Sequence, residues 1–445
     1  MDILPAIIVV VAVGTLCFLY RYVFYPAWIS PLAGIPNAHL LCSLTPLWME
    51  RQRKKSRELK TLYSAHEKYG PIVRLGPAEI SVVSQEGLKQ IYVAGLDKHS
   101  WYQQTFYAYG RQNLVSTLDH KTHSAQRRMI ARFYSKSYLQ HSEDLANLSR
   151  HIIFERLRPL LQRSPGQDVN VVELFEWTGL DFVTGHVFGM PHGTDFLQNK
   201  AGRDRYFHEY LHRKQTTCMY AEQFFLETCR TIISSDPDEK SCTANPTVFT
   251  SLYSQMDAAA EKGSLHVRGG DVLRRCASEV LDHVIATQET NTITWTYILY
   301  QLSLHPDAQV GLRNELQTLE PPLGPSSQAE RLTSPMNIDS LPLLAAIIHE
   351  TLRLHAANPA RMRRVVPSGG IELHGHSIPG GTTVSTNAYC LHRNKDVFPQ
   401  PSKWQPDRWL GSADHSRSEA MRWFWAFGSG PRMCIGTNFA MQGVC

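Results

Sequence analysis

The sequence lacks the paired cysteines of a disulfide framework or a structural zinc site. Its nine cysteines in 445 residues are odd in number and widely spaced, and none of them forms a Cys-x-x-Cys pair. This pattern argues against structural zinc and against a small disulfide-stapled scaffold. It fits a reducing compartment better.

Several motifs for nucleotide binding and hydrolysis are also absent. The chain contains no Gly-x-Gly-x-x-Gly, no P-loop lysine motif, no His-Glu-x-x-His and no Gly-x-Ser-x-Gly. It therefore has no evident nicotinamide or flavin site, no zinc-protease helix and no hydrolase nucleophile elbow. Electrons for any redox chemistry must then come from a separate protein.

The chain has little excess charge of either sign. Charged residues make up 19% and hydrophobic residues 43%, an ordinary globular balance with ample material for a core. The net charge of +5 is too small to indicate nucleic-acid binding, so we expect no nucleic-acid partner. It suits an acidic protein partner or an anionic membrane surface.

No charged residue occurs between Ile3 and Tyr20. This apolar run is close to the length that crosses a bilayer core. A cleaved signal peptide would carry positive charge before the run, whereas here Arg21 follows it. We predict a transmembrane anchor over residues 1–22 with a cytosolic body, and the alternative is a buried N-terminal helix. A proline-rich hinge over 23–37, in which Pro26 breaks regular structure, then leads to the body at 38–445.

The body is predicted to be mainly α with small β-sheets. We expect strands over 72–75 and 79–83, and a second small β region around 365–384. A long helix is predicted over 276–306. Another helix carries Pro342 in its first turn, with Asp339 or Ser340 as its cap. Length alone gives a prior of about three domains, but no internal repeat divides the body, so we expect one large domain.

The segment Phe427–Gly436 is the most informative part of the chain. Gly428 and Gly430 allow backbone angles that side chains forbid, and Pro431 stiffens the turn. Such a loop can direct backbone N–H groups at the sulfur of Cys434, which favours thiolate over thiol. An axial haem ligand needs a thiolate of this kind. The alternative is a glycine- and proline-rich loop around a buried structural cysteine.

This loop resembles the cysteine-ligand loop of the haem-thiolate monooxygenases, the cytochromes P-450. Phe427, Gly430, Arg432, Cys434 and Gly436 fall at the signature positions of that family. The resemblance extends from Tyr69 to the end and looks most like fungal microsomal members. It implies the cytochrome P-450 fold and haem b, with Cys434 as the axial ligand of the iron and with Phe427 and Arg432 at the cofactor.

The segment Ala286–Thr290 resembles the oxygen-activation segment of the same family. The resemblance implies that Glu289 and Thr290 supply protons to bound oxygen. A helical threonine can also bond the carbonyl four residues earlier and open a small groove. Thr287 stands where the family usually has glycine, and we expect its extra bulk to narrow the oxygen pocket or to alter the fit of the substrate.

Haem propionates need cations. The resemblance assigns this role to Arg127, Arg364 and Arg432, with His123 in place of a tryptophan that the family often has four residues before the first arginine. The alternative, for each of these residues considered alone, is an ordinary solvated residue on the protein surface.

Glu350 and Arg353 lie three apart on an apolar helix and can form an ion pair. The spacing alone is weak evidence for a special role, because Glu-x-x-Arg recurs at Glu50, Glu155, Glu227 and Glu419. The resemblance implies that this pair and Arg408 form a structural triad behind the haem, and a surface pair is the alternative.

We therefore expect a single-pass monooxygenase of the endoplasmic reticulum membrane. It would insert one oxygen atom from O2 into an apolar small molecule, a secondary-metabolite intermediate, with electrons from an NADPH-dependent flavoprotein reductase. By resemblance a C-terminal tail is missing after Cys445. Two alternatives stay open, an isomerase or dehydratase acting on a peroxide, and a truncated, non-catalytic membrane-anchored haem-binding protein.

Overall fold

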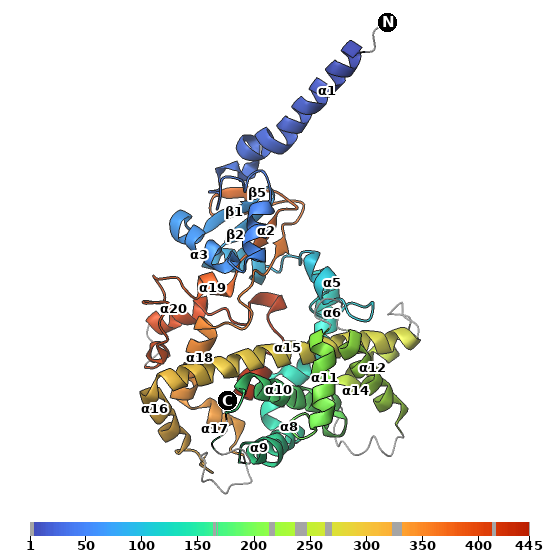
Figure 1. Ribbon diagram of the computed structural model, residues 1–445, viewed down its shortest axis with the longest axis vertical. Helices are drawn as coiled ribbons and strands as arrows, with labels where there is room; N and C mark the ends of the chain where they lie inside the picture. Colours follow the sequence, from blue (N-terminus) through green and yellow to red (C-terminus); the bar gives the residue numbers. More distant parts are fainter. Residues whose placement is uncertain are drawn as a thin grey trace. The chain divides into compact units, whose positions relative to one another are not determined.

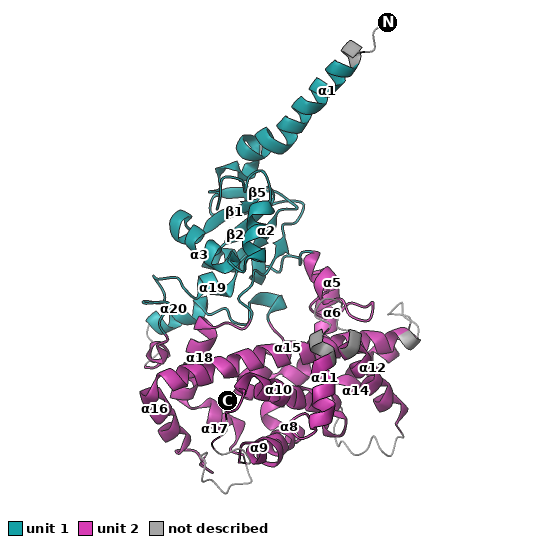
Figure 2. Ribbon diagram, viewed as in Figure 1, with its two compact units in different colours: residues 1–99, 358–403, 413–433 teal, residues 100–357, 404–412, 434–445 magenta. Residues whose placement is uncertain are grey.

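The computed structural model describes residues 4–162, 166, 168–212, 219–235, 247–262, 269–322, 332–411 and 415–444. The chain divides into two compact units, coloured teal and magenta in Figure 2. Unit 1 comprises residues 1–99, 358–403 and 413–433, and unit 2 comprises residues 100–357, 404–412 and 434–445.

Unit 1 contains the N-terminal helix, short helices and all of the strands that the described residues form. Its helical elements are α1 (Leu4–Leu19), η1 (Tyr20–Ile29), η2 (Pro31–Gly34), α2 (Leu47–Lys54), α3 (Glu58–Tyr69), α4 (Gln85–Gly87), η3 (Leu88–Val93), α19 (Ala388–Leu391), α20 (His415–Trp423) and η8 (Gly430–Arg432). Its strands are β1 (Ile72–Gly76), β2 (Glu79–Val82), β3 (Arg364–Val365), β4 (Ile371–Leu373), β5 (His376–Ile378) and β6 (Thr383–Ser385).

The strands form two small sheets, but β3 and β6 of the second predicted β region join β1 and β2 in one sheet instead of forming a separate one. The larger sheet has the order β1-β2-β6-β3, with β2 and β6 parallel and the other neighbours antiparallel. The smaller sheet is the β4–β5 hairpin, in which Ile371 pairs with Ile378. Its two turn residues, His374 and Gly375, both have positive φ, as a type I′ turn requires.

The N-terminal apolar segment is helical, exposed and longer than predicted. Residues Ile7–Ile29 form a helix long and apolar enough to cross a membrane. An 18-residue window of this helix has a mean hydropathy of 2.2 and no buried residues. The predicted break at Pro26 is wrong, because the helical path continues through it to Ile29. From Tyr20 the segment is wound as a π-helix, and this wider winding accommodates a proline ring without ending the helix.

Unit 2 is helical. Its elements are α5 (Trp101–Phe106), α6 (His120–Ile130), η4 (Ala131–Tyr134), α7 (Lys136–His141), α8 (Glu143–Arg150), η5 (His151–Leu157), α9 (Arg158–Gln162), α10 (Val171–Phe188), η6 (Met190–His192), α11 (Lys200–His212), α12 (Met219–Ser234), α14 (Val248–Glu261), α15 (Gly269–Leu304), α16 (Pro306–Leu316), α17 (Pro335–Asp339), α18 (Pro342–Leu354), η7 (Pro406–Trp409) and α21 (Thr437–Val444).

Helix α15 is the axis of unit 2. It is longer at its start than the predicted 276–306 and has 36 residues. Val272, Cys276, Val280 and Val284 recur every fourth residue on one face and are buried in the main core. Helices α10, α12, α14, α18 and α21 pack against it, and Figure 1 shows α15 running across the unit.

The start of α18 differs from the prediction. Pro342 is in the first turn as expected, but the cap residue is Leu341, whose apolar side chain cannot accept a hydrogen bond from the backbone. Asp339 instead ends the separate short helix α17. The Glu315 carboxylate of α16 accepts hydrogen bonds from the backbone N–H groups of Leu343 and Leu344, each at 2.8 Å. A neighbouring helix thus satisfies donors that a local cap would otherwise satisfy.

Candidate functional site

The glycine-rich loop before Cys434 belongs to unit 1 and is built around a close backbone approach. Gly430 has a φ of +72°, and a Cβ atom there would lie 2.1 Å from the backbone oxygen of Tyr92. Gly428 also has a φ of +72°, but a Cβ there would meet nothing within 4 Å. Only glycine therefore fits at Gly430, for reasons of both space and conformation. Phe427, between these glycines and Trp425, is partly buried.

Cys434 begins the last segment of unit 2, three residues before α21. Its side chain is solvent-accessible, although the residue lies deep among protein atoms. The backbone N–H of Gly436 forms a hydrogen bond to the thiol, and the Thr437 hydroxyl donates to the Cys434 carbonyl at 2.8 Å. Helix α21 then packs against α15, where the indole N–H of Trp295 donates to the carbonyl of Gly443 at 3.1 Å.

The electrostatics of Cys434 differ in sign from the sequence prediction. Desolvation by burial raises the pKa of the thiol and outweighs every other influence. The Gly436 N–H lowers that pKa, as the loop composition predicts. The Arg127 guanidinium lowers it too, and the Asp282 carboxylate raises it.

Helix α6 brings a cation to the thiol. Asp119 caps its start by accepting from the backbone N–H of Thr122 at 2.8 Å. Arg127, one turn after the buried His123, is close enough that its charge acts on Cys434. Burial lowers the pKa of Arg127, and the Cys434 sulfur acts in the opposite direction. Helix α6 therefore brings Arg127 to the thiol, with His123 one turn before it on the same helix.

The predicted proton-relay residues lie in the middle of α15. The hydroxyl of Thr290 donates to the carbonyl of Ala286 at 2.7 Å, the local bond that the sequence predicts. Glu289 and Ala286 are exposed on this otherwise core-forming helix. The segment of α15 that was predicted to activate oxygen therefore carries solvent-accessible residues.

The two remaining predicted cations lie in unit 1. The side chain of Arg432 is 1% exposed, and its Nη2 atom lies 3.6 Å from an Asp97 carboxylate oxygen. Arg364 is buried in β3, with its guanidinium carbon 5.0 Å from the centre of the Tyr92 ring. Both guanidinium groups are held in place from within unit 1.

Glu350, Arg353 and Arg408 meet in unit 2. Arg353 donates to both carboxylate oxygens of Glu350 at 2.8 Å, and neither side chain is exposed. Arg408 donates to Glu350 from η7 at 3.1 Å. The sequence did not predict two further donors, the indole of Trp409 and the backbone N–H of Gln405, each at 2.8 Å. With these partners the buried carboxylate meets the condition under which a buried charge is tolerated.

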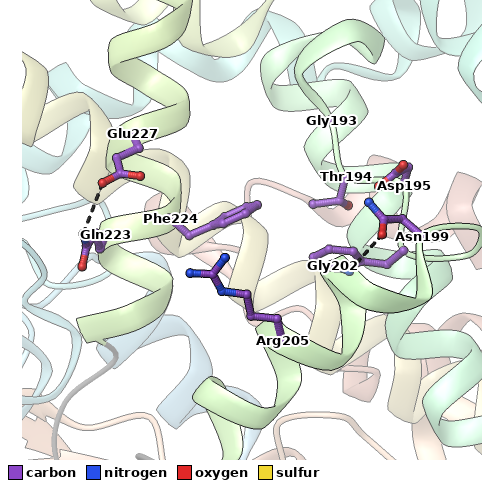
Figure 3. A pocket seen from close by; sticks show the side chains of 10 residues that line it. Gly193, Thr194, Asp195, Asn199, Gly202, Arg205, Gln223, Phe224 and Glu227 are labelled. Atoms are coloured by element: carbon purple, nitrogen blue, oxygen red, sulfur yellow. Dashed lines mark hydrogen bonds between the residues drawn. The ribbon is translucent and has the colours of Figure 1, made fainter.

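A separate hollow of about 430 Å³ lies in unit 2 beside α11 and α12. Figure 3 shows Arg205 and Phe224 projecting into it, and Gln223 donating to Glu227 at 3.2 Å on its rim. None of the residues that line it is among the predicted haem, proton-relay or triad residues. We therefore place the chemistry at Cys434 and not in this hollow.

The donor set around Cys434 fits an iron porphyrin better than a bare metal ion. Among the described residues, no group of three or more His, Cys, Asp or Glu side chains could hold a metal. One accessible sulfur with a backbone N–H directed at it fits a cysteine thiolate ligand of a haem iron. The guanidinium of Arg127 near that sulfur suits an anionic propionate.

Comparison with known proteins identifies relatives along the whole chain. The model of the family "Cytochrome P450" matches residues 273–444. The cytochrome P450 monooxygenase avaI of Aspergillus versicolor is 30% identical over 404 residues, which cover 85% of this chain and 93% of that relative. The monooxygenase orf2 of Aspergillus niger is 26% identical, covering 99% and 89%. The monooxygenase SAT11 of Stachybotrys chartarum is 27% identical, covering 97% and 84%.

Proposed function

The chain belongs to the cytochrome P450 family of monooxygenases, and we propose that it inserts one oxygen atom from O2 into an apolar small molecule. One observation supports this most. The accessible sulfur of Cys434 stands beside Arg127, before a helix that packs on the helix of Glu289 and Thr290. A thiolate ligand and a proton source must both be present for this reaction.

Cys434 would hold the haem iron, and Arg127 would hold a propionate, with Arg364, Arg432, His123 and Phe427 as the further cofactor residues that the resemblance assigns. When bound, the haem supplies oxygen binding and the cleavage of the O–O bond, which an axial thiolate favours by donating electron density. The buried Glu350–Arg353–Arg408 triad stabilises the fold of unit 2 and has no direct part in the chemistry.

The protein's own contribution to the reaction is to hold and move protons. The Thr290 hydroxyl donates a hydrogen bond to the Ala286 carbonyl, so its oxygen is left to accept a hydrogen bond from water. The exposed Glu289 carboxylate beside it can exchange protons with solvent. Together they keep a water in place at Thr290 Oγ1 and restore the protons that it gives up.

The substrate is proposed to be an intermediate of secondary metabolism, on the strength of the fungal relatives. The anchor is proposed to cross the endoplasmic reticulum membrane once, with the body in the cytosol. Its aromatic residues Tyr20, Tyr22, Tyr25 and Trp28 are exposed near the end of the span, where aromatic side chains favour the membrane interface.

An NADPH-dependent flavoprotein reductase is proposed as the electron donor. Lys121 and Arg128 are exposed on α6, the helix that brings Arg127 to Cys434. An acidic reductase surface would be attracted to these charges. Reversing both charges should slow reduction of the iron at low salt and leave the haem spectrum unchanged.

The carbon-monoxide difference spectrum of the reduced holoprotein tests haem ligation. A strongly red-shifted Soret band is expected for the parent chain and for Cys17→Ser, a matched change at an exposed cysteine of the anchor. Cys434→Ser should abolish that band. The same band in Cys434→Ser, or none in a parent chain loaded with haem, refutes the proposed ligand.

Turnover with NADPH and a microsomal reductase then tests the proton relay. Thr290→Ala should keep NADPH consumption but divert most electrons to peroxide, because water at Thr290 is no longer held. Thr294→Ala is the control, since Thr294 bonds the Thr290 carbonyl at 2.9 Å in the same way one turn later. Equal coupling of NADPH to product in both variants contradicts a relay at Thr290.

A further inference from the structure

Three buried side chains of unit 2, Tyr134, His283 and Glu279, form a hydrogen-bonded chain that the reaction described above does not use. The Tyr134 hydroxyl lies 2.8 Å from Nδ1 of His283, and Nε2 of His283 lies 3.2 Å from a Glu279 carboxylate oxygen. The other oxygen of Glu279 accepts from the backbone N–H of Leu114 at 2.8 Å. All three side chains are less than 10% exposed.

We assign the direction of these hydrogen bonds from the donor and acceptor types of the groups. A carboxylate oxygen accepts, so Nε2 of His283 donates to Glu279, and Nδ1 accepts from the Tyr134 hydroxyl. Glu279 and His283 lie one turn apart on α15, about two turns before the segment that carries Glu289 and Thr290. The phenol of Tyr134, at the end of η4, is thereby attached to α15.

The same tyrosine also attaches to α21. Its backbone carbonyl accepts from the Asn438 side-chain amide at 3.0 Å. Its ring packs edge-on against the ring of Phe439, with centroids 6.1 Å apart. Asn438 and Phe439 lie in the first turn of α21, four and five residues after Cys434. Phe439 also stacks on His186 of α10 at 4.6 Å.

We propose that Tyr134 is a positioning residue that sets the place of the Cys434 helix against α15. The inference rests on the proposed function, in which the sulfur and the Thr290 hydroxyl act on one reaction from two different helices. Their separation must hold closely, because a displacement of about 1 Å can cost two orders of magnitude in rate. Tyr134 is the residue that bonds α15 with its hydroxyl and α21 with its backbone.

Tyr134→Phe tests the proposal, since it removes one oxygen and keeps the ring. The control is Tyr138→Phe, which removes a phenol from the neighbouring helix α7, where the ring packs edge-on against Phe133. The first measurement is amide hydrogen exchange of the α21 peptide in the full-length protein. Tyr134→Phe should speed that exchange about tenfold, the scale of one buried donor or acceptor left unsatisfied, and Tyr138→Phe should not.

The second measurement has two parts. The first is the red-shifted Soret band of the reduced, carbon-monoxide-bound holoprotein, called the thiolate band below, and the second is the fraction of NADPH coupled to product. Tyr134→Phe should lose the thiolate band about tenfold faster on incubation and should couple less NADPH than Tyr138→Phe. His283→Gln, whose amide can still accept from Tyr134, should restore most of what His283→Ala loses.

The outcomes separate the two proposals. Unchanged α21 exchange in Tyr134→Phe overturns the positioning role. If α21 exchanges faster in Tyr134→Phe while the thiolate band and the coupling of NADPH stay unchanged, Tyr134 makes a purely structural contact, and the positioning role is also overturned. A parent chain that never shows the thiolate band refutes the proposed function, while the exchange measurement still decides whether Tyr134 holds α21.

Discussion

Replacing Glu350 by alanine tests the buried triad most directly. The Glu350 carboxylate accepts from Arg353, Arg408, Trp409 and the Gln405 backbone, and it has no exposed surface. Its loss leaves the fully buried Arg353 guanidinium without its bidentate partner. Breaking a buried pair on one side typically costs about 3–5 kcal/mol, because an uncompensated charge stays in the interior.

The chain provides a matched control for this substitution. Glu419 and Arg422 have the same three-residue spacing and the same 2.8 Å bond, but the Arg422 side chain is 63% exposed. Water screens such a pair, so Glu419→Ala should cost about 0–1 kcal/mol. The two variants therefore differ in burial and partners while the local sequence pattern is the same.

Urea unfolding of the full-length protein, followed by far-ultraviolet circular dichroism, gives the free energy of unfolding of each variant. The bound haem per protein chain should also fall in Glu350→Ala and stay at the parent value in Glu419→Ala. If Glu350→Ala does not accumulate, Glu350→Gln keeps the shape and gives an intermediate loss. Equal losses in Glu350→Ala and Glu419→Ala would refute the reasoning from burial.

Two further predictions concern unit 1. Gly430→Ala should destabilise the protein by more than about 2 kcal/mol and Gly428→Ala by only about 1 kcal/mol, measured by urea unfolding, because both have positive φ but only the first meets the Tyr92 backbone. Equal costs would contradict this. Burial lowers the pKa of His66 from 6.5 to about 4, so the stability that this residue contributes is complete above about pH 6.5 and is lost as the pH falls towards 4. His66→Asn should flatten the stability curve between those values, by roughly 3 kcal/mol at most, and an unchanged slope would count against this assignment.

The sequence alone could predict the elements and much of the site. Apolar periodicity and turn residues located the strands of unit 1 and the helix α15, which begins at Gly269 instead of Cys276 and ends at Leu304 instead of Pro306. The bond from Thr290 to Ala286 and the contact of the Gly436 N–H with Cys434 were predictable because each joins near neighbours. Local geometry fixes such contacts wherever the rest of the fold lies.

Contacts between distant segments could not be predicted in the same way. Glu315 caps α18 from 28 residues away, and nothing in its own helix indicates that role. Tyr134 and His283 are 149 positions apart, and a phenol and an imidazole carry no signal for each other. The sign of the Cys434 pKa shift was also out of reach, because desolvation depends on all the protein around the sulfur.

The recurring Glu-x-x-Arg spacing shows where the limit lies. Arg53 pairs with Glu58 instead of Glu50, Glu155 pairs with Arg150 instead of Arg158, and Glu419–Arg422 is an exposed pair. Among the five Glu-x-x-Arg pairs, and within the described residues, only Glu350–Arg353 has its carboxylate joined by donors from a second segment, Gln405 and η7, 55 to 59 residues later in the chain. A local pattern therefore states that an ion pair can form, and the partners brought by the fold decide whether that pair is buried and carries stability.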